Sequence, residues 1–151
     1  MIDDRARTGP YAVLDRIDRA TNGHDLDGLV ACFTSDYESV RPIHPARSFV
    51  GPEQVRRNWE QIFGAVPDLR TRVVGFAVSG DDVWAEWEFA GNRRDGEPYL
   101  MRGVVVLRVR DGRATHARFF LEPVEADAEE VDAAVRRLLT DPVRDSRSAK
   151  S

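Results

Sequence analysis

Apolar residues recur at helical spacing in three segments of the first half of the chain. Residues 10–22 and 52–66 each place their apolar side chains on one face, and both begin with proline in the first turn. Between them, Asp25 is placed to cap a short helix over residues 26–33. Pro67 ends the third segment. The pattern therefore predicts three helices in the N-terminal half.

From residue 70 onward, apolar and polar residues alternate and predict strands. The expected strands are residues 70–78, 83–89, 99–110 and 113–121, preceded by an earlier one at 37–41. Short turns rich in glycine and aspartate separate the last four, which is typical of an antiparallel meander. A final amphipathic helix is predicted over residues 128–139.

These elements predict one α+β domain over residues 10–124. We expect a cone-shaped, curved, mixed but mostly antiparallel sheet, with the three helices on its concave face and a C-terminal helix within residues 125–142. Residues 143–151 are polar and predict a disordered tail. A curved sheet under helices encloses a cavity, so an apolar pocket is expected.

The turn at Asp111 and Gly112 decides which strand faces line that pocket. A three-residue turn with a glycine bulge would point Met101, Val105 and Phe119 inward and the arginines of these strands outward. A two-residue turn would swap the faces and bring the arginines inward. Both alternatives are open at this point.

Composition narrows the possible partners. The 151 residues are 42% hydrophobic, and 26 acidic against 22 basic residues give a net charge of -4. No basic field exists to hold a phosphate backbone, so we expect no nucleic acid partner. No apolar run approaches a membrane span and no leader is evident, which predicts a cytoplasmic protein without membrane contact. The single cysteine, Cys32, lies in an apolar run and is expected in the core.

Several motifs together resemble the nuclear transport factor 2-like superfamily, in its SnoaL-like branch with the ketosteroid isomerase-like fold. They are the helix-turn signature over residues 20–33, Phe49-Val50-Gly51, the hairpin over residues 109–113 and the closing Phe120-Leu121-Glu122-Pro123. The resemblance implies the predicted fold. It implies no single activity, because this superfamily includes isomerases, cyclases, epoxide hydrolases, dehydratases and binding domains.

The catalytic residues of the resembling enzymes do not carry over. Where ketosteroid isomerases have an oxyanion-hole tyrosine, a general base and a protonated aspartate, this chain has Ile17, Arg41 and Val105. Where SnoaL-type cyclases have a catalytic aspartate and a second acid, it has Phe119 and Glu122. The Arg-x-Asp pair of the limonene epoxide hydrolase group is found on no predicted strand.

His44 is the candidate catalytic residue. Its loop follows the first strand, near the position of the isomerase base, and imidazole exchanges protons near neutral pH. The alternative is a surface or hydrogen-bonded loop histidine. His24, beside a turn, is expected to be exposed, and His116 to lie on the charged outer face. Because the three histidines are on separate elements, we expect no metal site, and no motif indicates a cofactor.

Aromatic and apolar side chains are the candidate ligand contacts. The predicted set is Trp59, Tyr37, Val105, Phe119, Trp87 and Met101. Trp59 is placed where the resembling isomerases have a cavity tyrosine, and core packing is its alternative role.

Three functions are compatible with the sequence. The first is a cofactor-independent isomerase, cyclase, dehydratase or hydrolase acting on a small apolar, polyketide- or terpenoid-like substrate. The second is a binding module for a hydrophobic ligand without chemistry. The third is a scaffold, and for it we expect a homodimer through the outer sheet face, where Trp84 and Phe120 are placed.

Overall fold

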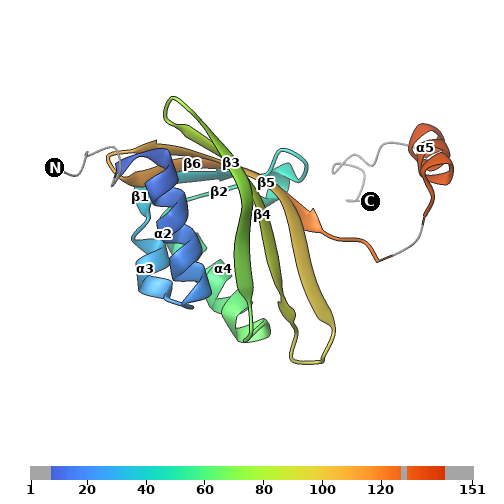
Figure 1. Ribbon diagram of the computed structural model, residues 1–151, viewed down its shortest axis with the longest axis horizontal. Helices are drawn as coiled ribbons and strands as arrows, with labels where there is room; N and C mark the ends of the chain where they lie inside the picture. The colour runs from blue at the N-terminus through green and yellow to red at the C-terminus, as the bar shows by residue number, and fades with distance from the viewer. Residues whose placement is uncertain (1–7, 127–128, 142–151) are drawn as a thin grey trace.

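The computed structural model describes residues 8–126 and 129–141, and shows a curved six-stranded sheet with three helices on its concave face (Figure 1). With the labels of Figure 1, the helices are α2 (Pro10–Asn22), α3 (Leu26–Val30), α4 (Pro52–Ala65) and α5 (Val131–Thr140). The strands are β1 (Phe33–Val40), β2 (Phe49–Val50), β3 (Arg70–Ser79), β4 (Asp82–Asn92), β5 (Pro98–Arg110) and β6 (Arg113–Pro123). The predicted α+β fold is confirmed. The tail expected at residues 143–151 lies outside the described residues.

The strand order is β2-β1-β6-β5-β4-β3. Strands β3 to β6 form the predicted antiparallel meander, and β1 lies parallel to β6. The sequence patterns did not indicate β2, whose Phe49 pairs with Ser39 of β1, or the short 3-10 helix η1 (Pro45–Arg47) before it. These two elements fix the loop between β1 and α4.

The helix boundaries follow local capping, with one correction. The Asp25 carboxylate accepts a hydrogen bond from the Gly28 N–H at 3.0 Å and caps α3, as expected. The predicted end of this helix at residue 33 is wrong. The Ala114 N–H donates to the Cys32 carbonyl at 2.8 Å, so pairing with β6 has already begun there, and Phe33 starts β1.

The hairpin between β5 and β6 has a two-residue turn, so of the two alternatives the three-residue turn is wrong. Asp111 and Gly112 both have positive φ, 51° and 77°, and Arg110 pairs with Arg113 across them. Positive φ at both central residues is characteristic of the type I′ turn, which matches the twist of paired strands.

A β-bulge nevertheless keeps the predicted faces. Val109 pairs with Ala114, whereas Arg108 pairs with His116, so Thr115 is an extra residue on β6. One extra residue reverses the inward and outward faces of a strand. The bulge therefore cancels the effect of the shorter turn, and the arginines of these strands stay outside.

The core lies between the helices and the concave face of the sheet. The inward residues of β4 are buried as predicted: Val83, Ala85, Trp87 and Phe89. Cys32 is also buried, and burial raises the pKa of its thiol, which favours the unreactive protonated form.

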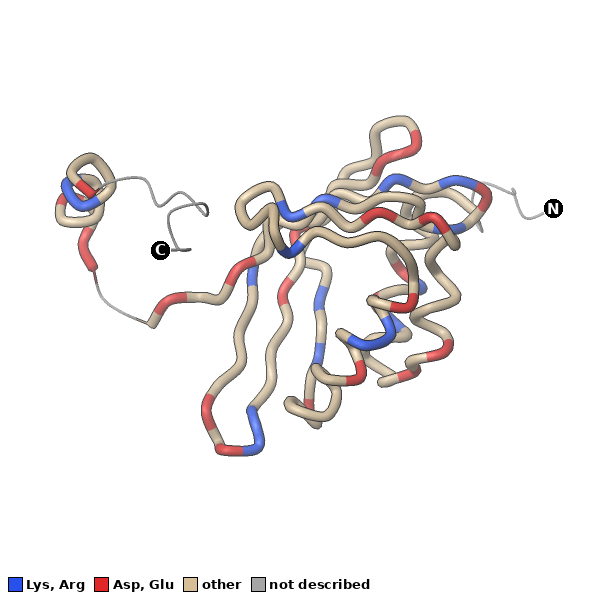
Figure 2. Tube along the Cα trace, turned by 180° about the vertical axis from the view of Figure 1, so that it is seen from behind, with Lys and Arg blue, Asp and Glu red and all other residues tan. Residues whose placement is uncertain are grey.

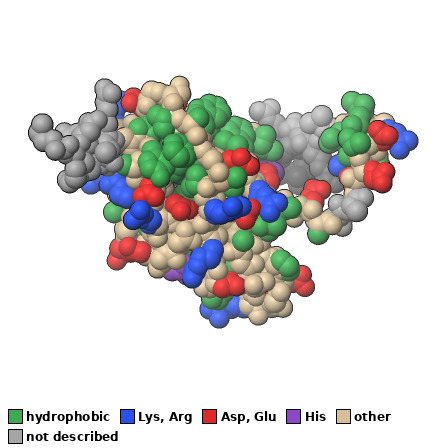
Figure 3. Space-filling view, in the orientation of Figure 1, with side chains coloured by type: hydrophobic (Ala, Val, Ile, Leu, Met, Phe, Trp, Pro, Cys, Tyr) green, Lys and Arg blue, Asp and Glu red, His purple; other side chains and the backbone are tan. Residues whose placement is uncertain are grey.

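Helix α5 extends away from the sheet at the end of the chain (Figure 1), and its apolar side chains are exposed (Figure 3). Val131 and Leu139 are 73% and 78% exposed. Among the described residues, the last backbone hydrogen bond to the sheet before α5 is from the Val124 N–H to the Leu100 carbonyl, at 3.0 Å.

We expect a chain that ends at residue 126 to unfold at the same urea concentration as the full chain, within about 0.5 kcal/mol of unfolding free energy, because exposed apolar residues contribute little burial. Chemical unfolding followed by circular dichroism measures this. A lower midpoint for the shortened chain would show that α5 belongs to the domain, contrary to the predicted boundary at residue 124.

Candidate functional site

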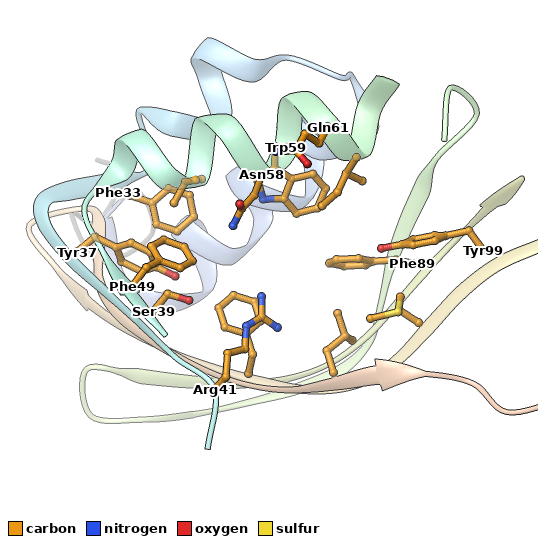
Figure 4. A pocket seen from close by; sticks show the side chains of 15 residues that line it. Phe33, Tyr37, Ser39, Arg41, Phe49, Asn58, Trp59, Gln61, Phe89 and Tyr99 are labelled. Carbon is orange, nitrogen blue, oxygen red and sulfur yellow. The ribbon is translucent and has the colours of Figure 1, made fainter. Parts of the chain in front are cut away.

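A cavity of about 310 Å³ lies between α4 and the sheet. Volumes of this size are typical of pockets for small molecules. Figure 4 shows its side chains coming from α4 on one side and from the strands on the other. Most of the lining is apolar or aromatic, including Phe33, Phe49, Val55, Ile62, Phe89 and Leu121. The cavity lies between the helices and the sheet, where the sequence predicts an apolar pocket, and its role as a binding pocket stays a prediction.

Four of the six predicted ligand contacts line this cavity: Tyr37, Trp59, Met101 and Phe119. The Trp59 ring packs against Phe63 and Phe89, at centroid distances of 5.4 and 5.7 Å, so it shapes the cavity and also joins the core. Ligand binding by these four side chains stays a prediction.

The other two predicted contacts, Val105 and Trp87, are not among the lining residues. Both point inward, but they lie where the helices cover the sheet. Val105 is fully buried, and the Trp87 indole N–H donates to Asp18 of α2 at 3.0 Å. A side chain on the inward face of a strand therefore lines the cavity only where the helices do not cover it.

His44 lies beside the cavity, in a second hollow of about 520 Å³. The two hollows share five lining residues: Arg41, Phe49, Asn58, Met101 and Leu121. His44 Nε2 is 2.9 Å from Glu122 Oε1, and the two side chains are 34% and 43% exposed. A carboxylate accepts only, so in the neutral ring Nε2 carries the proton and Nδ1 has the free lone pair.

Four polar residues of the cavity were missed by the sequence reasoning: Ser39, Arg41, Asn58 and Gln61. Ser39 and Arg41 follow Tyr37 at a spacing of two, so the alternation that placed Tyr37 inward also indicated them. Asn58 is three residues after Val55 and therefore on its side of α4. The comparison with ketosteroid isomerases places Arg41 at the position of the general base, a role that arginine cannot fill.

Burial changes the acid–base properties of the polar residues here. It raises the pKa of Tyr37 well above the usual range and raises that of Tyr99, whereas it lowers the pKa of the Arg41 guanidinium. Ser39 and Arg41 lower the pKa of Tyr37, against the larger effect of burial. The Ser39 hydroxyl nevertheless forms no hydrogen bond with that of Tyr37. Both tyrosines are therefore neutral hydroxyl groups at physiological pH.

The other two histidines lie outside this site. The prediction that His24 is exposed is wrong, because it is half-buried, with its Nε2 3.0 Å from the Leu69 carbonyl and its ring stacked on Phe63. His116 borders a shallow hollow on the outer sheet face. Among the described residues, no group of three or more histidine, cysteine, aspartate or glutamate side chains is placed to hold a metal ion.

The outer sheet face carries the residues expected at a dimer interface. Trp84 is 45% exposed, and the Arg118 guanidinium lies 5.4 Å from its ring centroid. The homodimer stays a prediction.

Acidic and basic positions are interspersed along the whole described trace (Figure 2). None of the helices described is long and apolar enough to cross a membrane.

The fold and the cavity can now be compared with known proteins. Solved structures that superpose on the chain include IdmH of Streptomyces antibioticus, described as a proposed polyketide cyclase. It matches at 21% identity and a TM-score of 0.65, over 74% of this chain and 91% of that one. A proposed SnoaL-like polyketide cyclase from Jannaschia sp. CCS1 matches at 20% identity and a TM-score of 0.63, over 87% and 92%. A protein of ketosteroid isomerase-like fold from Catenulispora acidiphila, solved with trimethylamine, matches at 17% and 0.63, over 72% and 84%.

Identities this low establish the common fold and not a common activity. No curated protein sequence is significantly similar to this chain. The model of one protein family, the SnoaL-like domain, matches residues 14–117, from the second turn of α2 to the first part of β6. This chain belongs to the SnoaL-like domain family.

Proposed function

We propose that the cavity binds a small, largely apolar molecule of polyketide or terpenoid type, and that His44 transfers a proton to or from it without a cofactor. The observation that carries this proposal is the position of the His44–Glu122 pair, 2.9 Å apart, in a hollow that shares five lining residues with the cavity. A ligand that fills the cavity and reaches its mouth would come beside His44. Two solved structures of this fold that are described as proposed polyketide cyclases support the proposal.

The pair suits general acid–base chemistry. Glu122 holds His44 in the tautomer with its lone pair on Nδ1, and a carboxylate next to the ring stabilises the imidazolium formed after proton uptake. Both side chains are partly exposed, so water can exchange the proton between turnovers. Isomerisation, cyclisation, dehydration and hydrolysis all need such a transfer.

We expect His44→Ala to lower kcat by about 100-fold or more, the usual contribution of a general base, and Glu122→Gln to lower it less. The substrate is sought first by native mass spectrometry of the purified protein, followed by denaturation and analysis of the released compound. His116→Ala is the matched control, because His116 is on the outer face. Turnover that is unchanged in His44→Ala would exclude the assigned role.

A binding protein without chemistry is the second candidate. The observation that favours it is that the described residues lining the inner cavity include no histidine, aspartate, glutamate or cysteine. This function predicts that a bound compound is recovered unchanged after long incubation, and detection of a product would eliminate it. The same native spectrum gives the mass of the homodimer that we expect through Trp84 and the outer sheet face.

A further inference from the structure

The guanidinium of Arg41 is the only charged group among the described residues that line the cavity. Its carbon atom lies over the Phe119 ring, 4.1 Å from the ring centroid. None of its N–H groups has a hydrogen bond or ion pair with a described residue. Glu122 acts on Arg41 through its charge but forms its close pair with His44. Arg41 therefore brings into the cavity a positive charge that has no ion pair with a described residue.

Ser39 provides a second group without a partner. The residue is 1% exposed, and its Oγ is the one buried side-chain oxygen or nitrogen of the described residues that has no hydrogen-bond partner. An unsatisfied buried hydroxyl costs stability, and such groups are found where a ligand completes the hydrogen bond. Figure 4 shows Ser39 and Arg41 on the same wall of the cavity, two residues apart along the chain.

Asn58 faces these residues from α4, and its neighbours fix which end of its amide is free. Arginine only donates, so the bond of 2.6 Å from Arg57 to Gln54 identifies the Gln54 atom as oxygen. Gln54 must then use its nitrogen toward Asn58, which accepts through Oδ1 at 2.8 Å. The Asn58 Nδ2 group is left with its hydrogens for the cavity, where Figure 4 shows the amide pointing.

We propose that the bound molecule is an apolar carboxylic acid whose carboxylate is held by Arg41, Ser39 and Asn58. This inference rests on the proposed function and names its substrate class. Three donor groups line the same end of the cavity, and the described lining residues include no carboxylate. A planar guanidinium matches a carboxylate in two parallel hydrogen bonds. A neutral ligand would leave the Arg41 charge desolvated and unpaired.

The rest of the cavity fits an apolar body of limited size. Beyond the polar end, the lining consists mainly of aromatic and aliphatic side chains, among them Phe89, Tyr99 and Trp59. A volume of about 310 Å³ equals about ten water molecules, which corresponds to about one or two rings. The carboxylate would lie next to the mouth, because Arg41 and Asn58 line both hollows.

The test uses pairs of probes that differ in charge and not in shape: cinnamate, naphthoate and decanoate, each compared with its amide by isothermal titration calorimetry. We expect the full-length protein to bind at least one acid about tenfold or more tightly than the matching amide, as a charge-assisted hydrogen bond predicts. Arg41→Met should abolish this preference by weakening the acid about tenfold or more, with the amide changed less than about twofold. Asn58→Asp keeps the shape and the bond from Gln54, and it should also weaken the acid.

Arg113→Met is the control, because it removes one positive charge from an exposed position at the hairpin outside the cavity lining. A thermal melt of each variant confirms that it is folded. Equal binding of acid and amide, or a preference that survives Arg41→Met, would overturn the inference and leave the proposed function standing. Failure of every acid and every amide to bind would overturn the proposed function, and the inference with it.

Discussion

Gly103→Ala is expected to destabilise the domain by about 3–5 kcal/mol, more than half of the stability of many small domains. Gly103 lies in β5 with φ +155°, a conformation that side chains rarely adopt. An added Cβ would overlap the Phe120 carbonyl oxygen and lie 2.8 Å from the Leu121 Cα. Both are backbone atoms of β6, so no side-chain rotation relieves the overlap, and the two strands would have to separate.

The close approach at Gly103 also shapes the site. Its paired residue Leu121 lines the cavity, as does Met101 two residues before it. Glycine kinks of this kind let a sheet curve. We therefore expect Gly103→Ala to disturb the cavity wall even in molecules that remain folded.

Urea unfolding followed by circular dichroism measures this effect, and Gly75→Ala is the matched control. Gly75 lies in β3 of the same sheet, and an added Cβ would meet nothing within 4 Å. Its unfolding free energy should stay within about 0.5 kcal/mol of that of the parent protein. Equal midpoints for Gly103→Ala and Gly75→Ala would refute the assigned close contact.

Apart from β2 and η1, the sequence patterns were sufficient for the element order, because each longer helix and strand has its own period and its own start or stop residue. They failed where pairing between distant segments decides the outcome. Phe33 belongs to a strand because Cys32 already bonds with Ala114, which is far away in the chain. Likewise, the bulge at Thr115 reflects the pairing of β5 with β6 and leaves no local residue signal.

The candidate site could also be predicted only in part, because local patterns locate some of its residues and distant pairing locates the others. Alternation along a strand indicates which side chains face inward, and this located Tyr37 and Phe119 at the cavity. It does not indicate how far the helices extend over the sheet, which is why Val105 and Trp87 were placed in the cavity and lie in the core. The partner of His44 could not be inferred from spacing, because Glu122 comes from the other end of the chain.

Asp18→Ala is expected to cost about 2–5 kcal/mol of unfolding free energy, the penalty for two buried donors that lose their acceptor. Asp18 Oδ1 accepts hydrogen bonds from the Thr71 hydroxyl at 2.6 Å and from the Trp87 indole N–H at 3.0 Å. Trp87 is 3% exposed and Thr71 is 7% exposed, so water cannot readily replace the carboxylate. This one side chain thus joins α2 to β3 and β4.

Asp15→Ala is the control on the same helix. Asp15 forms an ion pair with Arg19 at 2.9 Å, but the Arg19 side chain is 79% exposed, so we expect a change below about 0.5 kcal/mol. A double-mutant cycle then isolates the Trp87 bond. In a Trp87→Phe background, the cost of Asp18→Ala should be smaller by at least about 1 kcal/mol than in the parent protein. The reason is that phenylalanine has no N–H group that could lose its acceptor. If the cost is the same in both backgrounds, Asp18 stabilises the domain without the Trp87 hydrogen bond, and Trp87 lies in the core because of its apolar surface alone.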